Sequence, residues 1–139
     1  MRLRLAAASA LLVLVASCGS GGSAVEPEPD PKLYEQINSL TQPGRERSLK
    51  EMQPGPWDTV HVFEEYTSKE QIERTIGTGI GIDDYTGPGQ LFFFMSAGKV
   101  FRAVELDASR VPGGTYSSGV VLRGGPIPGG VRLEVVDPK

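Results

Sequence analysis

The sequence predicts an α+β fold: a small two-layer domain in which N-terminal helices and a further short helix pack on an antiparallel β-meander of about five strands. Three observations carry this prediction. Apolar residues recur with helical spacing over residues 33–40, an apolar hairpin occupies 91–106, and further strand-like runs follow it. Helices that precede consecutive antiparallel strands are typical of the α+β class.

Two short helices are expected at the start of the domain. Asp30-Pro31 should begin the first, because Asp caps helices and Pro suits the first helical position. Pro43-Gly44 should end it, and residues 45–53 predict a second helix. The inward face of the first helix carries apolar residues at i, i+4 and i+7: Leu33, Ile37 and Leu40.

Residues 57–63 then read as a strand that contains the chain's only histidine, His61. Val60 and Val62 should share one face, with His61 and Phe63 on the other. A histidine can act as an acid or base near neutral pH. A metal site here would need carboxylates alone as its other side-chain ligands, so we expect a surface or structural histidine and no metal.

A third short helix is expected after residue 66. Its start has the pattern of a capping box, either Thr67 with Glu70 or Ser68 with Gln71. Gly77 should end it. The helix should lie on the sheet through one apolar stripe, Ile72 and Ile76.

The glycine-rich run 77–81 invites a phosphate-loop interpretation, but such loops follow a strand and open a helix, whereas this one follows a helix. Asp83-Asp84 in the same loop could meet a hard cation, yet two adjacent carboxylates without further spaced oxygen ligands are a weak pattern. We therefore expect no cofactor and a solvated turn.

The strongest fold signal is a hairpin of residues 91–95 and 100–106 around a glycine-containing turn. Its first strand is apolar on both faces, which is typical of a central strand covered on both sides. Helices should cover one side. The other side could be covered by a loop, a partner or a lipophilic ligand. Residues 116–123 and 131–136 predict a last pair of strands, joined by a loose loop over 124–130.

The N-terminus has the three parts of a secretory signal, which we assign to residues 1–17. Arg2 and Arg4 precede an apolar run that is too short to cross a bilayer. Val15-Ala16-Ser17-Cys18 resembles the bacterial lipobox, in which the cysteine is acylated and becomes the first residue of the mature protein. We therefore predict Cys18 as a lipid-attachment residue. A single cysteine cannot form an internal disulfide, and acylation would use its thiol.

Residues 18–31 are expected to tether a single domain, 32–139, to the lipid. The tether has a Gly/Ser-rich part followed by alternating prolines. Without residues 1–17 the chain keeps 12 basic and 17 acidic residues, a net charge of −5. An acidic chain is a poor candidate for nucleic acid or for electrostatic binding to anionic lipid.

Part of the region 67–104 resembles the SmpA/OmlA (BamE-like) envelope lipoproteins. The resemblance covers about 40 of the 139 residues and implies a non-enzymatic scaffold in envelope assembly. Gly79 stands where that family has Pro, and we carry over no functional residue. The matching segments are Thr67-Ser68-Lys69-Glu70-Gln71-Ile72, Ile76-Gly77-Thr78, Leu91-Phe92-Phe93-Phe94 and Gly98-Lys99-Val100.

These observations predict an exported, lipid-anchored protein of the cell envelope that is not an enzyme and binds a protein or envelope component through its sheet. The anchor would lie on the outer face of the cell membrane, or in the outer membrane of a cell that has two. A carrier of a lipophilic ligand is the alternative, suggested by the doubly apolar strand. An enzyme would need two carboxylates that converge in a cleft, from among Glu64, Glu65, Asp83 and Asp84.

Overall fold

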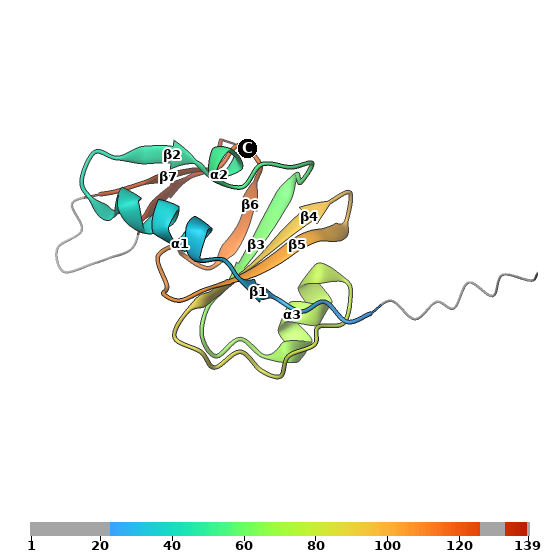
Figure 1. Ribbon diagram of the computed structural model, residues 1–139. Helices are drawn as coiled ribbons and strands as arrows, with labels where there is room; N and C mark the ends of the chain where they lie inside the picture. The colour runs from blue at the N-terminus through green and yellow to red at the C-terminus, as the bar shows by residue number, and fades with distance from the viewer. Residues whose placement is uncertain (1–22, 126–132, 139) are drawn as a thin grey trace, which may run out of the picture.

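The computed structural model describes residues 23–125 and 133–138 (Figure 1). The predicted signal and Cys18 lie outside the described residues. The fold is mixed α/β, with few helices and two sheets, so the predicted α+β class is confirmed only in this coarser form. None of the helices in the described part is long and apolar enough to cross a membrane.

The larger sheet has five strands in the order β1-β5-β4-β3-β6. The predicted hairpin is confirmed as β4 and β5, and the predicted strand over 57–63 is confirmed from Thr59 onward. β1 runs parallel to β5, and the other neighbours are antiparallel. The bounds are β1 (Glu28–Pro29), β3 (Thr59–Phe63), β4 (Gln90–Ser96), β5 (Lys99–Leu106) and β6 (Gly114–Ser117).

A second, three-stranded antiparallel sheet corrects the predicted single meander. The strand expected over 116–123 breaks at Ser118-Gly119, and its two halves join different sheets. Serine and glycine favour turns, and the Val120 amide donates to the Ser117 carbonyl across this one. The predicted strand 131–136 is described only from residue 133 onward. The sheet has the order β2 (Glu46–Ser48), β7 (Val121–Arg123), β8 (Glu134–Val136).

The helix starts and stops follow the sequence signals in two of three cases. Asp30 accepts a hydrogen bond from the Leu33 amide (2.9 Å), and Ser68 accepts one from the Gln71 amide (3.2 Å). Gly77 ends its helix with a left-handed φ of 75°. The helix expected over 45–53 is wrong in its first half, which forms β2. The helical elements are α1 (Pro31–Asn38), η1 (Ser39–Thr41), α2 (Leu49–Met52) and α3 (Lys69–Ile76).

Strand β4 is the centre of the core, as its two apolar faces predict. Phe92 and Phe94 pack with residues of α1, α2 and the second sheet on one face. Leu91, Phe93 and Met95 pack with α3 and the loop that follows it on the other. All five side chains are at most 4% exposed. Side chains of this chain therefore cover both faces of the strand.

The later part of the segment expected to form a tether, from Val25 onward, is paired with the domain. Val25 forms a parallel bridge with Ile80, and β1 pairs with Val104 and Glu105 of β5. The proline-rich part is therefore docked on the domain, although prolines at a sheet edge remain compatible with extended geometry. Any free tether must end before Val25.

Candidate functional site

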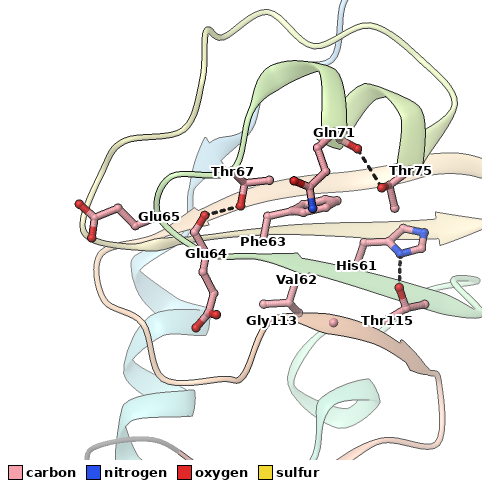
Figure 2. Close-up of a pocket in the computed structure, with 11 residues that line it drawn as sticks. His61, Val62, Phe63, Glu64, Glu65, Thr67, Gln71, Thr75, Gly113 and Thr115 are labelled. Atoms are coloured by element: carbon pink, nitrogen blue, oxygen red, sulfur yellow. Dashed lines mark hydrogen bonds between the residues drawn. The ribbon is translucent and has the colours of Figure 1, made fainter.

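A polar recess of about 470 Å³ lies between α3 and the β3–β6 edge of the large sheet (Figure 2). Strand β3 and the residues just after it form its floor, α3 one wall and the start of β6 the other. Hydroxyl, amide, imidazole and carboxylate groups line it around one aromatic ring. The lining residues are His61, Val62, Phe63, Glu64, Glu65, Thr67, Gln71, Thr75, Gly113, Gly114 and Thr115.

His61 lines this recess next to Thr115, because β3 and β6 pair in a register that sets the two residues opposite each other. Its ring nitrogen Nδ1 lies 2.8 Å from the Thr115 hydroxyl oxygen. Burial lowers the pKa of His61 from its usual 6.5, since desolvation disfavours the charged ring. The imidazole is therefore neutral at pH 7 and serves as a hydrogen-bonding group without a charge.

The α3 wall presents Gln71 and Thr75, one helical turn apart, toward β3. The Thr75 hydroxyl donates to the Gln71 carbonyl (2.8 Å). At the start of the wall, the Thr67 hydroxyl donates to the Glu64 carbonyl (2.6 Å), which closes the turn between β3 and α3. Phe63 lies under these groups and packs edge to face on Phe93, with ring centroids 5.7 Å apart.

Glu64 and Glu65 both line the recess, but their side chains diverge. Figure 2 shows Glu64 directed toward Gly113 and Glu65 directed away from it, because the chain leaves β3 at Phe63 and turns at Glu65. The Ser109 hydroxyl donates to a Glu64 carboxylate oxygen (3.4 Å). The two carboxylates therefore give the recess negative charge without forming the converging pair that acid–base catalysis needs.

The β6 wall is held by a buried side chain that the sequence analysis missed. Gln90, fully buried at the start of β4, accepts hydrogen bonds from the amides of Arg110 and Val111 (3.0 Å each) and donates to the Val111 carbonyl. The Tyr116 hydroxyl donates to the Pro112 carbonyl (2.6 Å). These contacts fix the loop that leads into Gly113 and Thr115.

The other candidates from the sequence lie away from this recess. Asp84 accepts a hydrogen bond from the Lys69 amide (2.7 Å), so it caps the first turn of α3. In the glycine-rich run, Gly79 and Gly81 pair through their backbones with Val25. In residues 23–125 and 133–138, no three His, Cys, Asp or Glu side chains gather closely enough to hold a metal ion.

The structure brings together residues that the sequence analysis did not connect. Thr115 is 54 positions from His61, and nothing in a single sequence reports that pairing. Gln71 and Thr75 carry a local signal, because they share the polar side of a helix whose other side is apolar. Gln90 lies between Gly89 and an apolar strand, and a polar residue in that position predicts an exposed strand end and not a buried side chain.

The apolar face that suggested a carrier of a lipophilic ligand is occupied by the chain itself. Ile72, Ile76, Ile80 and Tyr85 pack on Phe93, and each is at most 5% exposed. The recess beside them is lined mainly by polar groups. The observation that motivated the carrier hypothesis is therefore explained by core packing.

No protein-family model, curated protein or solved structure matches the chain. The resemblance of 67–104 to the SmpA/OmlA lipoproteins rests on its motif residues and stays a prediction.

Proposed function

We propose that the protein is an exported, lipid-anchored and non-enzymatic component of the cell envelope, which binds an envelope component in the recess between α3 and the β3–β6 edge. The observation that carries the binding role is the polar lining of this recess around a neutral histidine. The observation that carries the anchor is the lipobox-like sequence ending at Cys18.

The charge of the recess supports one class of ligand. Two carboxylates and no lysine or arginine line it, and His61 is neutral at pH 7. Phosphate and other anions would meet repulsion there, whereas hydroxyl groups and amines would find acceptors on several sides. A hydroxylated or amine-bearing ligand, such as an amino sugar, fits this lining better than a nucleic acid or a lipid tail.

Binding explains the His61–Thr115 pair better than catalysis does. A hydroxyl beside an imidazole is also the first half of a nucleophile–base pair. A general base works best when its pKa is close to the operating pH. Burial lowers the pKa of His61, which weakens it as a base. The pair then acts as a fixed hydrogen-bonding unit for a ligand.

The anchor is tested by the mass and fractionation of the full-length protein in a bacterial host. The processed protein should carry a diacylglycerol on Cys18 and stay with the membrane fraction, and Cys18→Ala should lose that mass. Ser20→Ala, two residues further along the chain, is the matched control and should keep it. An unmodified wild-type mass, or a Cys18→Ala protein with unchanged mass and membrane retention, would remove the anchor from the proposal.

The recess is tested by ligand-induced thermal shifts of the lipidated protein in detergent. Glucosamine should raise the melting temperature, inorganic phosphate should not, and His61→Gln with Gln71→Ala should abolish the effect. Lys32→Ala changes an exposed residue outside the recess and is the control. A shift with phosphate, or a glucosamine shift that survives the double substitution, would contradict the proposed site.

A further inference from the structure

The N-terminal segment is fastened to the domain at several points before α1 begins. The Val25 amide donates to the Gly79 carbonyl (2.9 Å), and the Gly81 amide donates to the Val25 carbonyl (2.8 Å). Further on, Asp30 forms an ion pair with Arg102 of β5 (2.6 Å). If Cys18 carries the lipid, as proposed above, the chain that is free to act as a tether ends before Val25.

That tether is short compared with the domain. Seven residues span at most about 25 Å when fully extended. A random coil of seven residues reaches roughly 15 Å. A compact domain of about 100 residues has a radius of gyration of about 13 Å and is therefore about 35 Å across. The side of the domain opposite Val25 cannot contact the bilayer, because the tether, even when fully extended, is shorter than the domain is wide.

The surface around Val25 suits a lipid headgroup layer. A shallow hollow of about 340 Å³ lies there, between the end of α3 and the turn of the β4–β5 hairpin. Val25 and residues 76–78 and 98–100 line it. Exposed Lys99 is its charged residue, and no carboxylate lines it, although the mature chain has an expected net charge of −5. Exposed Glu26 follows Val25 directly, so it is the hollow itself, and not the whole end of the domain, that presents no carboxylate to an anionic surface.

We propose that this end, formed by Val25, residues 76–78 and residues 98–100, rests against the lipid surface, held there by the short tether. The inference rests on the proposed lipid anchor. The tether leaves beside β5, whereas the polar recess lies at β3 and β6, the other edge of the sheet. With strands about 4.8 Å apart, β1 and β6 are about 19 Å apart. The hollow and the recess come close only at the end of α3, where Thr75 lines the recess and Ile76 lines the hollow, and they share no lining residue. The recess would then lie beside the lipid contact and not within it.

The orientation is tested with the lipidated, full-length protein in phosphatidylcholine vesicles that contain a nitroxide-headgroup lipid. Cys18 is the only cysteine and its thiol is acylated, so a cysteine introduced elsewhere is the only site for a fluorescent label. Thr78→Cys and Lys99→Cys place the label at the proposed contact, and Thr78→Cys leaves the charge unchanged. Gln42→Cys is the control, exposed between η1 and the second sheet, where Figure 1 shows the chain far from the N-terminal segment.

Quenching by the nitroxide should be at least about twofold stronger at positions 78 and 99 than at 42, since the free tether reaches only roughly 15 Å. Equal quenching at the three positions, with the lipid mass confirmed, would overturn the orientation and leave the anchor intact. A missing lipid mass would instead overturn the anchor.

The role of tether length is tested separately. Twenty Gly/Ser residues inserted between Ser23 and Ala24 lengthen the coil to roughly 29 Å, close to the size of the domain. The difference in quenching should then shrink toward zero. If the difference is unchanged, the short tether is not what orients the domain, and the proposal is wrong.

Discussion

The two edges of the five-stranded sheet end in different ways. At one edge the chain's own N-terminal segment pairs with β5, and the Asp30–Arg102 ion pair locks it there. At the other edge β6 pairs with β3, and side chains along the two strands surround a polar recess. An exposed sheet edge tends to pair with other chains, and covering it with a short strand that contains proline prevents this.

Under the proposed function, this difference would separate attachment from recognition. At the β1–β5 edge, strand pairing and an ion pair hold the N-terminal segment on the domain. These contacts would resist the pull of a tether attached there. The recess edge gathers polar side chains on a floor of packed aromatic rings.

Gln90→Leu should destabilise the recess edge most. The change leaves the amides of Arg110 and Val111 and the Val111 carbonyl without their buried partner. Buried groups left unpaired cost about 1–3 kcal/mol each, so for three groups we expect a loss of at least about 3 kcal/mol in the free energy of unfolding, measured by urea denaturation. Gln71→Leu, on the exposed side of α3, should change it by less than about 0.5 kcal/mol. Similar values for the two variants would refute the role of Gln90.

Asp30→Ala should loosen the covered edge. It removes both the cap on the Leu33 amide and the partner of Arg102, from a side chain that is only 11% exposed. The two losses together should cost about 2 kcal/mol in urea denaturation. Asp30→Asn keeps a capping oxygen and removes only the charge, so it should cost about half as much. If the Asn variant is as unstable as the Ala variant, the cap contributes nothing.

His61→Gln should have the smallest effect and should show it only as a pH dependence. The pKa of His61 is below 6.5 in the folded protein, so the unfolded chain takes up a proton first as the pH falls. The stabilisation contributed by the neutral His61 side chain is therefore full above about pH 6.5. It is lost as the pH drops through the pKa of His61 in the folded protein. The fall in urea midpoint between pH 7 and pH 5 should be smaller in His61→Gln. Thr115→Val keeps the histidine and should keep most of the fall.

Several local features were predictable because their signals are local. Asp30-Pro31 and Ser68 cap their helices through side chains three residues from the amides they bind. The β4–β5 hairpin follows from two apolar runs around a glycine turn, and the central place of β4 follows from its two apolar faces. The caps and the hairpin turn depend on interactions between residues that are close in the sequence, and the apolar pattern that predicts the place of β4 lies within one short run.

The polar recess was predictable only in part. His61 stood out as the chain's one histidine, but its partner Thr115 and the wall that Gln90 supports come from distant segments. The backbone N–H and C=O groups of one strand can pair with those of many other strands. The sequence therefore does not say which strand lies next to which. Ser118-Gly119 carries a turn signal, but the strand-like residues on both sides of it predict one long strand.

The helix caps, the apolar hairpin and the mixture of helices and strands follow from the sequence, because short-range hydrogen bonds and the periodicity of apolar residues decide them. Only the tertiary structure decided that the strands divide between two sheets, that Glu28–Pro29 closes one edge, and that polar groups surround a recess at the other. The physical reason is that sheet pairing and the burial of polar groups depend on which distant segments satisfy each other's backbone and cover each other's apolar surface.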